Sequence, residues 1–170
     1  MNSLQQYLAA PPTGAAARLL RGFTALAVLT VTLFIFANSA AVAEASNQTS
    51  SMVQQQIHAL CDTVGKPGLK ELFTVWVVRK LAHFTEYALL GLVWLLCLWA
   101  YRRRLRWAAP LCLLTAAADE TVQRFTPGRS AQFSDVVLDF AGALTGLLCG
   151  LLVLCLCRMI YNFAKCHDKE

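Results

Sequence analysis

Ionisable side chains stand at the edges of strongly apolar segments, and they are the residues best suited to chemistry. His83 and Glu86 precede an apolar run that ends near Tyr101, while Asp119 and Glu120 follow another such run. An imidazole beside carboxylates can transfer a proton, hold a divalent cation or bind a polar group. The chain contains no G-x-S-x-G nucleophile motif. The residue types therefore leave acid–base chemistry, cation binding and ligand recognition open.

The composition predicts that these residues belong to a membrane protein. Of the 170 residues, 57% are hydrophobic and 15% are charged, whereas globular proteins average about 45–50% and about 25%. This balance excludes a disordered chain, a disulfide-rich mini-protein, a coiled coil and a nucleic-acid-binding tail. In a membrane protein, the positions of the charges along the chain are more informative than the net charge of +5. No nucleic-acid partner is therefore expected.

Four apolar segments predict an all-α fold, an integral membrane four-helix bundle, because a span needs about 20 helical residues. The two middle segments reach that length only by including ionisable residues such as Glu86 and Asp119. The expected spans cover residues 20–40, 80–101, 106–125 and 135–158. The expected domains are a cytoplasmic leader over residues 1–17, a transmembrane domain over residues 18–160 and a cytoplasmic tail over residues 161–170.

The positive charges predict the orientation, since Lys and Arg concentrate at the cytoplasmic ends of spans. With the amino terminus inside, nine of the fifteen Lys and Arg residues are cytoplasmic, four of them between Arg102 and Arg106. Both termini are thus predicted to be cytoplasmic in a multi-pass protein of the cell membrane. The first span also resembles a cleavable signal ending at Ala41–Ala43, although a retained span is favoured. Between the first two spans, residues Met52–Leu60 predict a short surface helix.

The depth of the polar groups follows from the helix rise of about 1.5 Å per residue. This rise places them roughly 20–35 Å from the cytoplasmic ends of their spans, against a hydrocarbon core about 30 Å thick. The polar groups are therefore expected to gather at the extracytoplasmic face. Asp119 and Gln123, four residues apart, are also expected to share one side of their helix. The predicted polar cluster, in which no residue is assigned a catalytic role, consists of Lys80, His83, Glu86, Tyr87, Asp119, Glu120, Gln123, Arg129, Ser130, Asp135 and Asp139.

A ladder of glycines runs along the last span. Asp135 and Asp139 share a helical face with Gly142, Gly146 and Gly150. Small residues at such a spacing let the backbone of a neighbouring helix approach closely. The face that packs against the bundle is therefore predicted to turn both carboxylates inward, toward the cationic side chains.

The seven cysteines predict neither a disulfide framework nor a zinc site. Most lie inside apolar runs, where a thiol behaves as a small hydrophobe, and Cys155-x-Cys157 lacks the spacing of a redox pair. No resident metal and no cofactor are assigned from the sequence.

Three short blocks combine the polar residues with neighbouring glycines. They are Lys80-x-x-His83-Phe84-x-Glu86-Tyr87 with Leu90-Gly91, then Asp119-Glu120-x-x-Gln123, then Pro127-Gly128-Arg129-Ser130 leading to Asp135 and Gly142. In this order they resemble the VanZ-like family of small bacterial membrane proteins, over about residues 29–152. One difference is Asp139, where the family usually has Asn. The resemblance implies a membrane protein of the bacterial cell envelope, whose founding member is associated with teicoplanin resistance, and it implies no known reaction.

Functions from different classes fit these residues. In the first, the cluster binds a lipid head group, a lipid-linked wall precursor or a glycopeptide, and Arg129 and Lys80 hold a phosphate or carboxylate. Such a protein could have an accessory role in antibiotic resistance. In the alternative, a membrane-embedded hydrolase or transferase acts on an envelope lipid, with His83 as the base and Glu86 or Glu120 as the acid. A third hypothesis makes the charges a structural network, and in every case the lipid bilayer is the surrounding partner.

Overall fold

The chain is helical throughout the part that the structure describes, with no strand there. The structure is a computed structural model, and it describes residues 13–41, 43–129 and 132–167. This confirms the all-α prediction. In chain order the elements are α1 (Gly14–Ala40), α2 (Ala43–Thr63), the 3-10 helix η2 (Pro67–Leu72), α3 (Val75–Ala100), the 3-10 helix η3 (Leu105–Trp107), α4 (Ala108–Arg124) and α5 (Phe133–His167).

Three of the described helices are long and apolar enough to cross a membrane. They are α1 with 27 residues, α3 with 26 residues and the Phe133–Ala164 part of α5 with 32 residues. They coincide with the first, second and fourth expected spans. Helix α4 coincides with the third, but its 17 residues make it shorter, at roughly 25 Å. The apolar composition thus resides in helices that are suited to contact with lipid.

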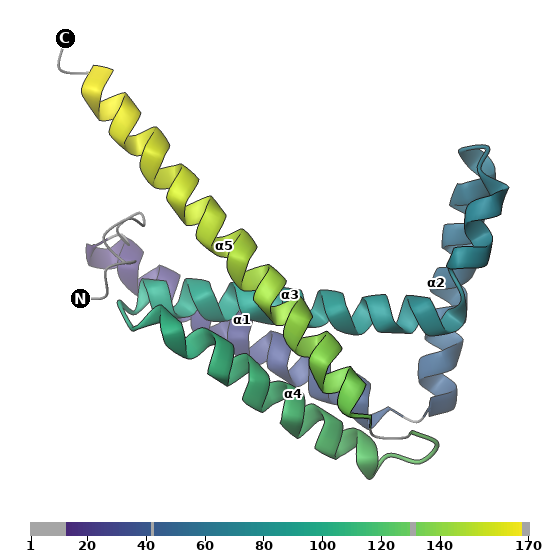
Figure 1. The fold of residues 1–170 in the computed structure, drawn as a ribbon. Coiled ribbons are helices and arrows are strands. Elements are labelled where there is room, and N and C mark those ends of the chain that lie inside the picture. The colour runs from purple at the N-terminus through teal and green to yellow at the C-terminus, as the bar shows by residue number, and fades with distance from the viewer. Residues whose placement is uncertain (1–12, 42, 130–131, 168–170) are drawn as a thin grey trace.

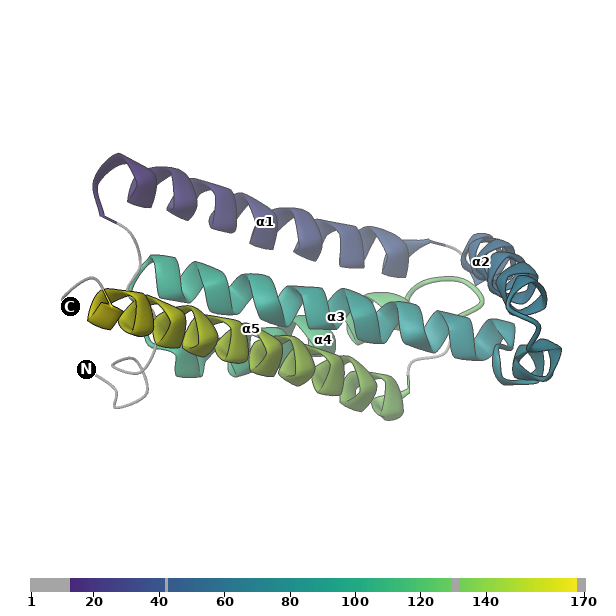
Figure 2. The ribbon, with the colours of Figure 1, turned by 90° about the horizontal axis from the view of Figure 1, so that it is seen from above.

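The helices α1, α3, α4 and α5 alternate in direction (Figures 1 and 2). The start of α1, the connection between α3 and α4, and the end of α5 lie at one end of the bundle. At the opposite end, α1 stops, α3 begins, α4 stops and α5 begins, and α2 lies beside them. We call this the α2 end. The polar residues at the ends of these four helices therefore lie close together at the α2 end.

Helices α3 and α5 pack backbone to backbone through glycines. A Cβ atom added at Gly91 of α3 would overlap the carbonyl oxygen of Ala143, and one added at Gly146 of α5 would overlap that of Ala88. Gly142 faces the carbonyl oxygen of Phe84 in the same way. This confirms the close approach that the glycine ladder predicts. The contact fixes the register in which the polar residues of α3 meet those of α5.

A small apolar core lies next to the polar residues and joins α1, α3, α4 and α5. Its largest side chain is that of Tyr87, which is fully buried. The buried members of this core are Ile35, Tyr87, Leu90, Cys112, Ala116 and Ala143. At the other end of the bundle, the Arg21 side chain of α1 donates from Nε to the carbonyl oxygen of Ala100, at 3.1 Å. Helix α1 is therefore fastened to α3 near both of its ends.

Helix α2 runs across the α2 end, at a steep angle to α1 and α3 (Figure 1). The expected surface helix over Met52–Leu60 is present and longer, because it extends over Ala43–Thr63. Gln54 donates from Nε2 to the carbonyl oxygen of Phe73 at 2.7 Å, and His58 Nε2 lies 3.1 Å from the same oxygen. These contacts tie α2 to the segment just before α3.

Candidate functional site

Polar side chains from α1, α3, α4 and α5 converge at the α2 end, within the outer turns of each helix. The structure brings together all but one of the residues that the sequence singles out. The exception is Ser130, which lies outside the described residues. We call the following set the polar cluster: Lys80, His83, Glu86 and Tyr87 of α3, Asp119, Glu120 and Gln123 of α4, Arg129 of the α4–α5 loop, and Asp135 and Asp139 of α5.

An ion pair joins the second turn of α3 to the first turn of α5. The Lys80 ammonium group contacts Asp135 Oδ1, and both side chains are largely buried, at 15% and 17% exposed. The Ser134 hydroxyl group lies 3.2 Å from the same carboxylate oxygen. The Lys80 ammonium group also lies 5.7 Å from the centre of the Trp76 ring, although that ring faces outward. The pair therefore neutralises two charges at the packed helix junction.

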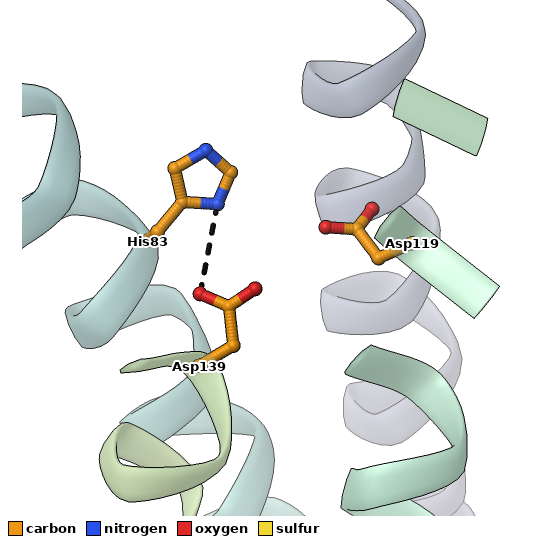
Figure 3. Close-up of side chains that lie close together, drawn as sticks. All are labelled: His83, Asp119 and Asp139. Carbon is orange, nitrogen blue, oxygen red and sulfur yellow. Dashed lines mark ion pairs between the residues drawn. The ribbon is translucent and has the colours of Figure 1, made fainter. Parts of the chain in front are cut away.

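Deeper in the cluster, three side chains from three helices point toward one another (Figure 3). His83 Nδ1 of α3 lies 3.9 Å from Asp139 Oδ1 of α5. The Asp119 carboxylate of α4 faces both of them. Asp119 is 0% and Asp139 is 1% exposed. Two carboxylates and one imidazole thus share an enclosed space between α3, α4 and α5.

The end of α1 supplies hydrogen-bonding groups to α4. Gln123 donates from Nε2 to Asp119 Oδ2 at 3.1 Å, as their shared helical side predicts, and to the Ser39 hydroxyl oxygen at 3.2 Å. Thr126 donates its hydroxyl proton to the carbonyl oxygen of Ser39 at 3.1 Å. All four residues are buried. These bonds connect the end of α1 to Asp119 through Gln123.

Asn38 links two further members of the cluster. Its side-chain amide donates to Glu86 Oε1 at 2.8 Å, and its carbonyl oxygen accepts from Arg129 Nη2 at 2.9 Å. Burial lowers the pKa of Arg129, and the nearby cationic Arg79 acts in the same direction. An arginine nevertheless stays charged in a protein. A permanent positive charge is therefore held between α1 and α3.

Glu120 organises the start of α5. Its Oε1 atom accepts a hydrogen bond from the backbone N–H of Gln132, just ahead of the first helical residue, Phe133. A carboxylate at this position is favoured, since the N-terminus of a helix carries partial positive charge. Arg124, in the last turn of α4, has an exposed side chain.

A cleft opens at the α2 end beside the cluster, with a volume of about 170 Å³. Two arginines, Arg79 and Arg129, stand in its wall together with His83 and Glu86. The complete lining is Asn38, Ala41, Ala45, Ser46, Thr49, Ser50, Arg79, Ala82, His83, Glu86 and Arg129. Helix α2 therefore contributes hydroxyl groups to a space that α3 and the α4–α5 loop line with charged groups.

An apolar groove adjoins this cleft and runs between α1, α2 and α3, with a volume of about 500 Å³. The two share Thr49, Ser50, Ala82 and Glu86. The remaining groove residues are Phe34, Val53, Ile57, Val78, Leu81, Thr85 and Leu89. A charged cleft thus continues directly into an apolar channel on the outer surface of the bundle. This arrangement suits a molecule with an anionic head and a hydrocarbon chain.

Several residues of the site are missed by the sequence interpretation. Asn38, Ser39 and Thr126 are uncharged, and the first two lie at the end of the expected first span over residues 20–40, so their residue types alone did not mark them. Counting from Arg21 places Asn38 roughly 25 Å along its helix, the depth of the other polar groups. That calculation could have identified it. Nothing comparable in the sequence marks Arg79 as a cleft residue.

Comparison with known families agrees with this architecture. The model of the VanZ/LLP1 family matches residues 23–156, which is most of the chain and includes every residue of the polar cluster. No curated protein and no solved structure matches the chain at a significant level. The family resemblance that the three sequence blocks indicated is confirmed. The chain therefore belongs to the VanZ/LLP1 family.

Proposed function

We propose that this chain is a multi-pass membrane protein of the bacterial cell envelope that binds the anionic head group of an envelope lipid in the cleft at its α2 end. The single observation that supports this most strongly is the continuity of the charged cleft with the apolar groove. Arginine favours phosphate because its planar group donates two parallel hydrogen bonds. Arg79 and Arg129 would hold the phosphate, and the groove would take part of the lipid chain.

The proposed membrane topology has four spans, with α4 as the third and both termini in the cytoplasm. The alternating helix directions support an even number of crossings. The arginines between Arg102 and Arg106 lie at the end of the bundle opposite the cleft, where the positive-inside rule favours the cytoplasm. On this assignment the cleft faces the extracytoplasmic side, and α2 lies along the outer surface of the membrane.

The size of the cleft favours a head group over a larger ligand. A volume of about 170 Å³ is below the roughly 300–1,000 Å³ of typical drug-sized pockets. A glycopeptide, as a glycosylated peptide, would have to bind outside it. The preferred ligand is therefore a phospholipid or a lipid-linked wall precursor, and an accessory role in resistance would act through that lipid.

Lipid binding can be measured on the full chain purified in mild detergent, by native mass spectrometry with added phosphatidylglycerol, a polyprenyl phosphate and a zwitterionic lipid. We expect the anionic lipids to bind in preference. Replacing Arg79 and Arg129 together with Gln is expected to weaken that binding at least about tenfold, because charge-assisted hydrogen bonds contribute roughly 1.5–3 kcal/mol each. Comparison of the two anionic lipids distinguishes a phospholipid from a prenyl-linked precursor.

Arg124→Gln is the matched control, since it removes an exposed arginine from the same end of the bundle. It should leave lipid binding unchanged. Arg79→Gln alone is included because Arg129 also supports Asn38. Equal binding of anionic lipid by wild type and by both cleft variants, each eluting as a folded monodisperse protein, would contradict the proposal.

The alternative is a hydrolase or transferase that acts on the same lipid. The observation that favours it is the position of His83, which lines the cleft while its Nδ1 faces the Asp139 carboxylate. A carboxylate that orients an imidazole increases its usefulness as a base. Release or transfer of the head group during incubation, lost in His83→Gln, would favour this alternative. Stable lipid binding without turnover would favour simple recognition.

A further inference from the structure

The enclosed space between α3, α4 and α5 combines the donor types of a metal site. One ligand atom from each of His83, Asp119 and Asp139 lies within 4.8 Å of the other two. The three side chains come from different helices and converge on a common point (Figure 3). Each helix is held in register by the packing described above. The arrangement is therefore built by the fold and does not depend on a mobile surface segment.

The atoms that face this space lack hydrogen-bond partners in the described part of the chain. They are His83 Nδ1, Asp119 Oδ1 and both carboxylate oxygens of Asp139. Both aspartates are almost completely buried. A buried carboxylate without a partner is costly, and nearly all such groups in proteins are satisfied. The Gln123 amide donates to the other oxygen of Asp119, and the Ser39 and Tyr87 hydroxyl groups also interact with this carboxyl group. A bound cation would compensate these unpartnered nitrogen and oxygen atoms.

The ionisable groups of the cluster and the cleft wall include more carboxyl groups than cationic side chains. Its carboxylates are Glu86, Asp119, Glu120, Asp135 and Asp139, whereas the cations in the cluster and cleft wall are Arg79, Lys80 and Arg129. Lys80 is engaged with Asp135, and Arg129 donates to a backbone carbonyl group. Among the described residues, no lysine or arginine side chain therefore forms an ion pair with the two aspartates beside His83. A doubly charged cation would balance them.

We propose that His83, Asp119 and Asp139 bind a divalent transition-metal ion. Imidazole nitrogen favours zinc and related ions, and carboxylate oxygen favours harder ions such as manganese. Three protein ligands with the remaining positions taken by water are typical of open zinc sites. The ligand set is therefore suited to zinc or manganese. His83 also lines the cleft, so the ion would lie beside the head group. The cation site does not depend on lipid binding.

The test uses the full chain, purified with an affinity tag that contains no histidine and without added metal. Elemental analysis is expected to find about one zinc or manganese ion per chain, because preformed ligands bind such ions tightly. After treatment with a chelator, adding zinc or manganese should raise the thermal unfolding midpoint, since a ligand that binds the folded state stabilises it.

Two substitutions are matched to this site. Asp139→Asn keeps the size of the side chain but removes its charge, and His83→Gln removes the imidazole. Each is expected to weaken metal affinity at least about tenfold, comparable with the roughly 10–100-fold effects of disturbing ligand support. Glu71→Gln, at an exposed carboxylate in η2, should bind metal as the wild type does.

Two outcomes would overturn the metal site. One is wild-type protein that contains no zinc or manganese and whose unfolding midpoint does not respond to either ion at millimolar concentration. The other is metal binding that is equal in the wild type, Asp139→Asn and His83→Gln. Lipid binding through Arg79 is measured separately on chelator-treated protein, so failure of the metal site leaves the proposed function standing.

Discussion

Replacing Gly146 with alanine is expected to push α5 away from α3 and to reduce the amount of folded protein sharply. The new Cβ atom would overlap the carbonyl oxygen of Ala88, which is backbone and cannot swing aside. Overpacking of this kind costs about 1–3 kcal/mol or more. The same displacement would separate His83 from Asp139. Folding and the polar cluster should therefore fail together.

The measurement is the thermal unfolding midpoint in detergent, together with the yield of monodisperse protein. Gly22→Ala is the matched control, because nothing lies within 4 Å of the Cβ atom that it adds. Alanine is favoured over glycine in a helix by up to about 1 kcal/mol, so this control should be neutral or stabilising. Gly91→Ala should behave like Gly146→Ala, since it meets the backbone of Ala143. A Gly146→Ala protein as stable as Gly22→Ala would show that the helices are not in this close contact.

Replacing Lys80 with methionine is expected to lower the stability of the folded chain strongly, because it leaves the Asp135 carboxylate without its cation. Both side chains are mostly buried, and breaking a buried pair costs about 3–5 kcal/mol. We expect a destabilisation near the lower end of that range, since each side chain keeps some exposure. The thermal unfolding midpoint of the purified chain measures it.

A second ion pair in the same chain provides the control. Lys70 and Asp62 are 2.5 Å apart, but their side chains are 32% and 56% exposed. Lys70→Met should therefore cost no more than about 1 kcal/mol. Combining Lys80→Met with Asp135→Leu removes both charges and should recover much of the stability lost in Lys80→Met. If Lys80→Met and Lys70→Met lost the same amount of stability, the result would argue against a buried Lys80–Asp135 pair.

The sequence predicts the helices well because the apolar runs are long and clearly bounded. The boundaries are less predictable. Helix α3 begins at Val75, one turn before its expected start, because Thr74 caps it by accepting a hydrogen bond from the Val77 N–H. Helix α5 continues to His167, beyond the expected span end at residue 158. The residues after Arg158 include neither glycine nor proline, so nothing interrupts the helix.

The common depth of the polar residues could be predicted from helix rise, whereas their partners could not. Helical periodicity alone does not say that Lys80 meets Asp135 while His83 faces Asp139. That pairing depends on the register between α3 and α5, which the glycine contacts set. Trp76 shows a further limit of helical periodicity, because it lies one turn before Lys80 on the same helical face yet its side chain is exposed.

The order in which the helices are synthesised affects the folding of this chain, because α3 forms its main contacts with α5, which is made later. Lys80 and Asp135 are separated by 55 positions, and the backbone surface that receives Gly146 belongs to α3. A nascent chain that has inserted α3 into lipid must therefore keep its charged face shielded until the ribosome has delivered α5. During that interval we expect the translocon or a membrane chaperone to keep the charged face of α3 away from lipid. Chains truncated before Phe133 should accordingly be substrates for membrane quality-control proteases.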